Sequence, residues 1–177
     1  MKPVPWVLAI GGFIGLVASF VLTIEKIALL KDPFYVPTCS INPVLSCGSI
    51  MKTAQAEVFG FPNPLLGIAG FAVVTTVGVL LLAGVTLPRW VWLGLQVGVT
   101  LGVLFVHWLI IQSLYEIGAL CPYCMVVWAV TIPIFWYTTL RNVRPTFQYH
   151  SVVLILWYLL IAGGILQAFW FYWSTLV

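Results

Sequence analysis

The stretch Cys121-Pro122-Tyr123-Cys124 places two thiols at the start of a long apolar run, which begins at Met125. Positions three residues apart on one helical turn bring Cβ atoms to about 5–6 Å, so the pair can close into a disulfide with little backbone motion. Pro122 suits the first position of a helix, which leaves Cys121 at the helix N-terminus, where free N–H groups favour a thiolate. The stretch predicts a redox-active pair where a hydrophobic helix meets water.

The rest of the chain has the composition of a membrane protein. Hydrophobic residues make up 63% and charged residues only 6%, against about 25% charged residues in soluble domains. Charge-free stretches lie at 3–24, 58–88, 90–115, 117–140 and 145–177, and each is long enough for a membrane span of ~20 apolar residues. The net charge of +3 is small and dispersed, so nothing indicates nucleic-acid binding. We expect one all-α integral membrane domain over 1–177.

The spacing of these stretches predicts five transmembrane helices, over 6–30, 64–84, 90–117, 122–140 and 151–175. The first is expected to be an uncleaved helix and not a signal peptide, with Glu25 and Lys26 reaching the membrane interface near its end. Residues 31–63 form an outer loop, in which 48–58 is expected to form one short surface helix. Asn63 is a typical N-cap for the helix that begins at Pro64. His107 is expected to be a packed, hydrogen-bonded residue.

Loop charges predict the orientation of these helices. One side carries basic residues without acidic ones, namely Lys2, Arg89, Arg141 and Arg144. This side is expected to be cytoplasmic. The opposite side then holds all four cysteines, Cys39, Cys47, Cys121 and Cys124. Disulfides form and persist outside the cytoplasm, so the cysteines lie on the side that suits them.

Three segments together resemble the vitamin K epoxide reductase family, in its bacterial branch. The first has Cys39 and Cys47 with seven residues between them, the second cysteine lying in Ser46-Cys47-Gly48-Ser49. The second is Phe59-Gly60-Phe61-Pro62-Asn63-Pro64-Leu65-Leu66-Gly67, and the third is the Cys-Pro-Tyr-Cys stretch. The combination is specific, whereas one Cys-x-x-Cys alone is a weak signal.

The resemblance implies a four-helix bundle around a quinone, menaquinone or ubiquinone, with the fifth helix outside this catalytic core. It implies that Cys124 faces the quinone, that Cys121 exchanges with Cys47, and that Cys39 meets a separate thioredoxin-fold, DsbA-like protein. Asn63 matches the family asparagine that hydrogen-bonds a quinone carbonyl. Trp128 stands where vertebrate members have a tyrosine, and is expected to line the quinone site.

The expected function is therefore a membrane thiol oxidase. It would re-oxidise the DsbA-like protein and pass electrons through two cysteine pairs to the membrane quinone pool, in a bacterial inner membrane with the site on the periplasmic side. Two alternatives stay open: a quinone-independent carrier of reducing equivalents across the bilayer, and a structural membrane protein with a disulfide-stapled loop. A zinc site is disfavoured because Cys-x₇-Cys is a poor zinc spacing.

Overall fold

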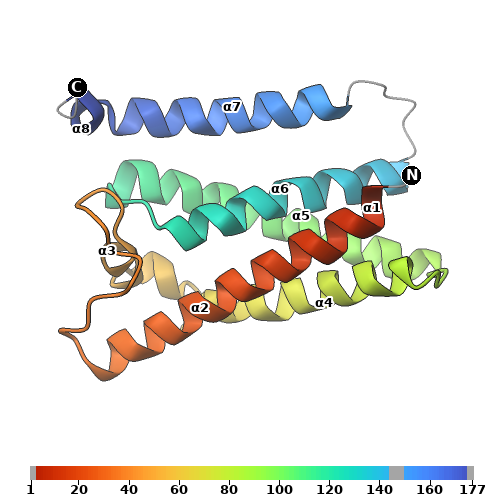
Figure 1. The fold of residues 1–177 in the computed structure, drawn as a ribbon, viewed down its shortest axis with the longest axis horizontal. Helices are drawn as coiled ribbons and strands as arrows, with labels where there is room; N and C mark the ends of the chain where they lie inside the picture. Colours follow the sequence, from red (N-terminus) through yellow and green to blue (C-terminus); the bar gives the residue numbers. More distant parts are fainter. Residues whose placement is uncertain (1–2, 144–149, 175–177) are drawn as a thin grey trace.

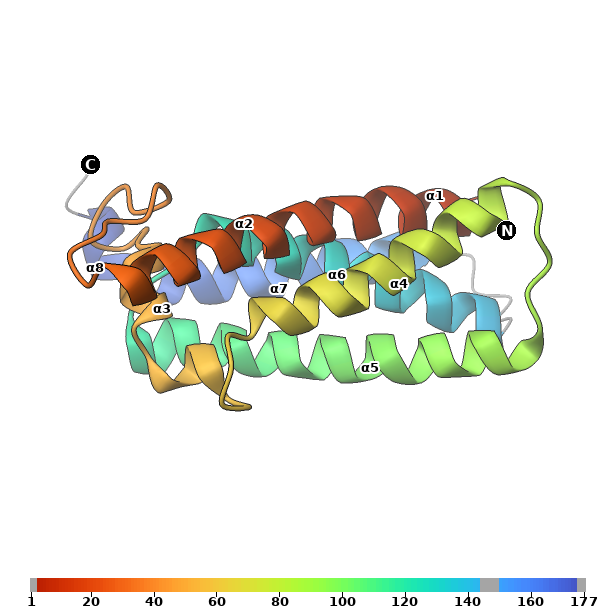
Figure 2. The same ribbon diagram turned by 90° about the horizontal axis from the view of Figure 1, so that it is seen from below.

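The computed structural model describes residues 3–143 and 150–174. Within these ranges the chain forms helices and loops without a β-strand, and five helices are long and apolar enough to cross a membrane. These candidate spans are Pro3–Lys31, Pro64–Leu82, Arg89–Ile117, Pro122–Val143 and Ser151–Ala168. They run side by side along one long axis (Figures 1 and 2). The predicted all-α membrane fold is confirmed.

Several spans contain more than one helical segment. The first consists of α1 (Pro3–Trp6), the π-helical turn η1 (Val7–Gly11) and α2 (Gly12–Lys31). The second is α4 (Pro64–Leu82), and the third joins α5 (Arg89–Ile111) to a second π-helical turn, η3 (Gln112–Ile117). The fourth is α6 (Pro122–Val143), and the fifth is α7 (His150–Ala168), which is followed by the short α8 (Trp170–Ser174).

The surface helix predicted over 48–58 is wrong as a single element. The structure instead has α3 (Cys47–Met51) and the 3₁₀ turn η2 (Ala54–Glu57). Thr53 ends the first of these, because its backbone N–H and its hydroxyl both donate to the carbonyl of Ile50, at 3.1 and 2.7 Å. A local side-chain bond of this kind competes with continuation of the helix.

The last predicted helix, over 151–175, also differs in the structure. Its main helix ends at Ala168, and a turn at Phe169 leads into α8. Residue 175 lies outside the described residues, as do Lys2 and Arg144, whose charges entered the predicted orientation. The orientation across the membrane stays a prediction.

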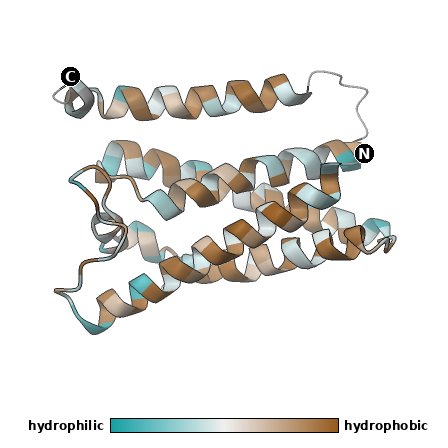
Figure 3. Cartoon of the chain, viewed as in Figure 1, coloured by the Kyte–Doolittle hydropathy of each residue, from teal (hydrophilic) through white to brown (hydrophobic). Residues whose placement is uncertain are grey.

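Side-chain polarity follows the long axis of the bundle. Apolar residues cover most of each helix, and the strongly hydrophilic ones lie toward the two ends (Figure 3). Large apolar side chains such as Val97, Leu101 and Leu104 of α5 are exposed on the outside. Their spacing of three or four residues puts them on one helix face, so this face suits contact with lipid.

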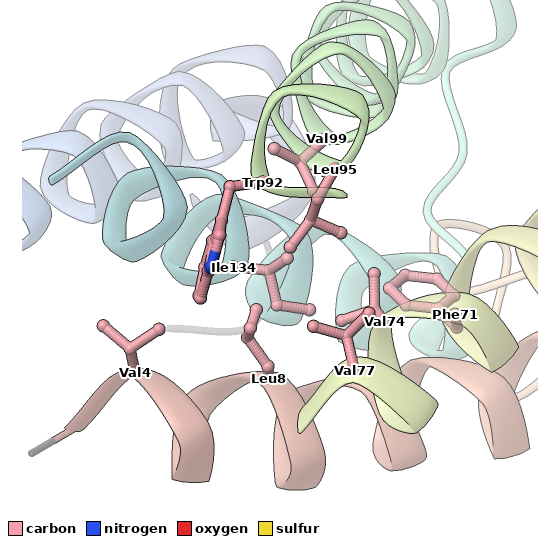
Figure 4. Packing of buried hydrophobic residues seen from close by; sticks show 9 residues of the cluster. All are labelled: Val4, Leu8, Phe71, Val74, Val77, Trp92, Leu95, Val99 and Ile134. Carbon is pink, nitrogen blue, oxygen red and sulfur yellow. The ribbon is translucent and has the colours of Figure 1, made fainter. Parts of the chain in front are cut away.

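A hydrophobic core closes the end of the bundle that contains the N-terminus. Its buried residues come from the first four spans and point toward one another (Figure 4). They are Val4, Leu8, Phe71, Val74, Val77, Trp92, Leu95, Val99 and Ile134. This packing fixes the helices at one end and leaves the opposite end for the cysteines.

The first span and α4 approach each other closely at glycines. A Cβ atom at Gly78 would lie 2.3 Å from the backbone nitrogen of Ala9, and one at Gly15 would lie 2.5 Å from the ring of Phe71. A larger residue at Gly78 would force the two backbones apart, and one at Gly15 would displace the ring of Phe71, since such contacts lie far inside van der Waals separation. The two spans therefore form one tightly packed wall of the bundle.

Helix α7 packs on the outside of the bundle, against α6 and η3. Pro133 in α6 has no N–H, so the carbonyl of Ala129 lacks its usual donor. The hydroxyl of Tyr158 on α7 donates to that carbonyl at 2.5 Å. The indole N–H of Trp157 donates to Nε2 of His107 at 2.9 Å, which confirms that the histidine is a packed, hydrogen-bonded residue.

Candidate active site

Three sulfur atoms meet at the end of the bundle opposite that core. Cys39 and Cys47 form a disulfide, and the Sγ atom of Cys47 lies 2.9 Å from the Sγ atom of Cys121. All three cysteines are buried, and their sulfur atoms lie within 4.8 Å of one another. Cys124, the third residue of α6, is a free thiol like Cys121. The structure thus brings together the four cysteines that the sequence singled out.

Backbone pairing between two distant segments creates this arrangement. Leu45 and Leu120 form an isolated parallel bridge. The N–H of Ser46 donates to the carbonyl of Leu120 at 2.8 Å, and the N–H of Leu120 donates to the carbonyl of Val44 at 2.7 Å. Because a reactive cysteine follows each segment directly, the pairing places Cys47 beside Cys121.

Each of the two segments then turns into a helix. The hydroxyl of Ser46 accepts from the N–H of Ser49 at 3.3 Å, so Ser46 is the N-cap of α3 and Cys47 its first residue. The carbonyl of Cys121 accepts from the N–H of Met125 at 3.0 Å, which makes Cys121 the residue before α6, as predicted. Free N–H groups at a helix start stabilise negative charge.

Cys121 has the electrostatic surroundings of a reactive thiol. A hydrogen bond from the Cys124 thiol lowers the pKa of Cys121, and the backbone N–H groups of Cys124 and Tyr123 act in the same direction. Burial and the negative charge of Glu25 act in the opposite direction. The net lowering favours a thiolate, which is the nucleophile in disulfide exchange.

A cavity of about 600 Å³ extends from the cysteine end into the bundle. Residues of α2, α3, η2, α4, α5, η3 and α6 line it, and most of them are apolar. Its wall contains glycines at regular intervals, namely Gly67 and Gly70 of α4 and Gly94, Gly98 and Gly102 of α5. A Cβ added at Gly70, Gly94 or Gly98 would meet no heavy atom within 4 Å. The last three glycines therefore leave apolar space open along the bundle.

Few polar side chains line this cavity. At its cysteine end they include Lys26, Gln55, Asn63, Ser113 and the thiol of Cys124. Trp128, also in the wall, is 4% exposed. Its indole N–H has no hydrogen-bond partner in the part of the chain that the structure describes. A buried donor of this kind is costly unless it is paired, so a ligand oxygen in the cavity would relieve it.

The prediction that the Asn63 side chain caps α4 is wrong. Asn63 has helical dihedral angles and makes no side-chain cap hydrogen bond. Its Nδ2 atom instead donates to the carbonyl of Gln55 at 2.7 Å, and its Oδ1 atom accepts from the N–H of Val58 at 3.2 Å. The amide thus clamps η2 to the start of α4. The second hydrogen of Nδ2 stays available to a molecule in the cavity.

Sequence reasoning missed a pair of charged residues near this site. Glu25 and Lys26 were expected to reach the membrane interface, but they are 5% and 6% exposed. Nζ of Lys26 forms a salt bridge with Oε1 of Glu57 at 2.8 Å and donates a hydrogen bond to the carbonyl of Met51. Two adjacent opposite charges inside an apolar run are the sequence signal that could have indicated this burial, because buried charges need partners.

Glu25 accepts hydrogen bonds from the loop that carries Cys39. Its carboxylate accepts from the hydroxyl of Tyr35 at 2.9 Å, and from the N–H of Thr38 at 3.3 Å and the Thr38 hydroxyl. Donating to this carboxylate raises the pKa of the Tyr35 hydroxyl. Glu25 therefore holds the chain directly before Cys39.

Comparison with protein-family models gives a match to the vitamin K epoxide reductase family over residues 6–139. The matched region covers nearly all of the first four spans and all four cysteines, and it ends before α7. A search of curated proteins finds no match to the chain. Because the family model covers most of the sequence, including the whole cysteine site, this membrane protein belongs to the vitamin K epoxide reductase family.

Proposed function

We propose that this protein is a quinone-linked thiol oxidase, which re-oxidises a thioredoxin-fold, DsbA-like protein. Family membership gives a membrane oxidoreductase that acts on thiols and disulfides. The observation that carries the finer proposal is the continuity of the sulfur relay. In the outer disulfide, Cys39–Cys47, the Sγ atom of Cys47 lies 2.9 Å from the Sγ atom of Cys121. Cys124, which with Cys121 forms the inner pair, lines the cavity.

The relay moves two electrons inward by two exchange steps. After the partner's dithiol has reduced the Cys39–Cys47 disulfide, the thiolate of Cys47 attacks Cys121 in a Cys121–Cys124 disulfide. The Cys47–Cys121 bond forms, the Cys121–Cys124 bond breaks, and Cys124 leaves as a thiolate. Cys39 then attacks Cys47, which restores the outer disulfide and releases Cys121. Two electrons and two protons have passed from the outer pair to the inner pair.

The described state corresponds to the end of this transfer. Cys39 and Cys47 are joined, while Cys121 and Cys124 are both free thiols. The inner pair therefore holds the two electrons, and one of its sulfurs lines the cavity. Re-forming the Cys121–Cys124 disulfide requires a two-electron acceptor at that sulfur.

The cavity fits a quinone as that acceptor. Its volume of about 600 Å³ lies within the usual range for small-molecule sites, roughly 300–1,000 Å³. The glycine-lined apolar length suits an isoprenoid tail, and donors at the cysteine end suit the two ring carbonyls. Asn63 and Trp128 are the side chains we assign to those carbonyls. When bound, a quinone supplies the capacity to accept two electrons and two protons.

The orientation and the partner follow from the same scheme. Four cysteines at one end of the bundle suit a protein that works on one face of the membrane, and we place that face on the periplasmic side of a bacterial inner membrane. A carrier without quinone would need cysteines that can be reached from both faces. The gathering of all four sulfurs at one end favours the oxidase.

The test is quinol formation by the full-length protein in detergent micelles. A small dithiol reduces the protein, excess reductant is removed, and menaquinone or ubiquinone is added under anaerobic conditions. We expect one quinol for each pair of thiols lost. Cys124→Ala should abolish quinol formation, whereas Cys39→Ala should retain it with the small dithiol and lose only oxidation of a DsbA-like protein. Thiol loss without quinol would overturn the proposal.

A further inference from the structure

The outer disulfide is closed to the protein that is supposed to reduce it. Cys39 is 5% exposed and Cys47 is 0% exposed. A thiol of another protein has to approach a sulfur atom directly to exchange with it. In the described conformation Cys121 reaches Cys47, but a partner protein reaches neither cysteine. Residues 32–46, which we call the first loop, must therefore move before the partner can react.

Two sets of hydrogen bonds hold the first loop, one on each side of Cys39 along the chain. After Cys39, Val44 and Ser46 pair with the backbone of Leu120. Before Cys39, the bonds that join the loop to α2 include those from Tyr35 and Thr38 to the Glu25 carboxylate. The first set fixes Cys47 against Cys121, whereas the second set holds the backbone at Cys39 itself.

We propose that Glu25 is a positioning residue, which holds the Cys39–Cys47 disulfide against Cys121, and that breaking its bonds to the first loop exposes Cys39 to the partner. The proposal rests on the proposed function, in which Cys39 is the sulfur that meets the partner. Thr38 directly precedes Cys39, so little chain separates the carboxylate from the disulfide. Tyr35 is half-buried and Thr38 is exposed, and their bonds to Glu25 are only partly buried, so these bonds lie at the edge of the site.

Glu25 also lies within electrostatic reach of Cys121, the thiol that faces the Cys39–Cys47 disulfide. A hydrogen bond from Cys124 is the main cause that lowers the pKa of Cys121, and the charge of Glu25 opposes that lowering. Removing the charge without removing the side chain should therefore lower the pKa of Cys121 further. A residue that only stabilised the fold would leave the pH profile of Cys121 unchanged, so this second effect separates the two roles.

The experiment measures how fast reduced glutathione opens the Cys39–Cys47 disulfide in the full-length protein in micelles. The glutathione thiolate bonds the sulfur of Cys39 while Cys47 leaves as a thiolate, so the reaction is followed as the Cys39–glutathione mixed disulfide by mass spectrometry of acid-quenched samples. Tyr35→Phe and Thr38→Val each remove a donor and keep the buried carboxylate, and Glu25→Gln removes its charge. We expect each to speed the reaction about tenfold, as loss of one hydrogen bond to a charged group predicts for an opening equilibrium. Thr38→Ser keeps the hydroxyl and should react like the unmodified protein.

Asp32→Asn is the matched control, because the Asp32 carboxylate accepts from the N–H of Phe34 within the same loop. It should leave the glutathione rate unchanged. Equal rates in Tyr35→Phe, Thr38→Val and the unmodified protein would overturn the proposal, even if Glu25→Gln failed to fold. A Glu25→Gln protein that folds and has an unshifted pH profile for Cys121 alkylation would also overturn it. The assay needs neither quinone nor a partner protein, so its failure is distinct from failure of the proposed oxidase activity.

Discussion

Replacing Asn63 by aspartate tests how the structure uses this side chain. The amide of Asn63 donates to the carbonyl of Gln55 at 2.7 Å and accepts from the N–H of Val58 at 3.2 Å. An ionised aspartate keeps the acceptor but places an oxygen against the Gln55 carbonyl, where a donor had been. If Asn63 were instead a helix cap, aspartate would replace it with little loss, because the two residues cap about equally well.

The structure sets the size of the expected effect. Leaving a carbonyl without its donor costs about 1–3 kcal/mol when the group is buried, and the half-buried position of Asn63 favours the lower part of that range. For a chain of this length, 1 kcal/mol shifts the melting temperature by roughly 2–4 °C. We therefore expect Asn63→Asp to lower Tm by about 2–6 °C at neutral pH. Asn63→Ala loses both bonds and should fall at least as far.

Thermal unfolding in micelles and quinol formation should be measured on the same preparations, with turnover recorded well below Tm. Lowering the pH until the introduced aspartate is protonated should restore a donor, so the difference in Tm from the unmodified protein should shrink. Both variants should also lose turnover, since neither supplies an N–H to a quinone carbonyl. An aspartate variant with unchanged Tm and an alanine variant with reduced Tm would contradict the clamp and support a cap.

Three further predictions concern the thiols and the packing. Cys124→Ala removes the main bond that lowers the pKa of Cys121, so the pH at which Cys121 is half-maximally alkylated should rise. Gly78→Ala should cost about 1–3 kcal/mol of stability through backbone overlap, whereas Gly70→Ala, which meets nothing within 4 Å, should be neutral or stabilising in thermal unfolding. Tyr158→Phe loses the hydrogen bond to the Ala129 carbonyl, which Pro133 leaves without a backbone donor. The loss should cost about 1 kcal/mol of stability and be measured as faster proteolysis around α7.

The membrane spans could be predicted from the sequence because their cause is local. A bilayer requires about 20 apolar residues in a row, and such rows are visible without knowledge of any contact. The inner cysteine pair could be predicted for a similar reason, because a spacing of three residues on a helix fixes the distance between the two side chains. Pro122 marked the start of α6 for the same kind of reason.

Contacts between distant segments could not be predicted from these local patterns. Sequence reasoning took Asn63 for a cap because its place before Pro64 is typical of one, but folding brought η2 within reach of its amide. It took Glu25 and Lys26 for interfacial residues, but the outer loop folds back and supplies partners that allow their burial. In both cases the deciding bonds join residues that are not neighbours on the face of one helix.

The sequence by itself determined the class of this protein: an all-α membrane domain with a thiol pair at the start of its fourth span. The resemblance to a family added the expected roles of the cysteines. Only the tertiary structure decided that Cys47 lies 2.9 Å from Cys121, across 74 residues of chain. The physical reason is that the length of an apolar run and the spacing of residues on a helix depend only on one segment of the chain. The pairing of Leu45 with Leu120, by contrast, exists only after distant segments have packed together.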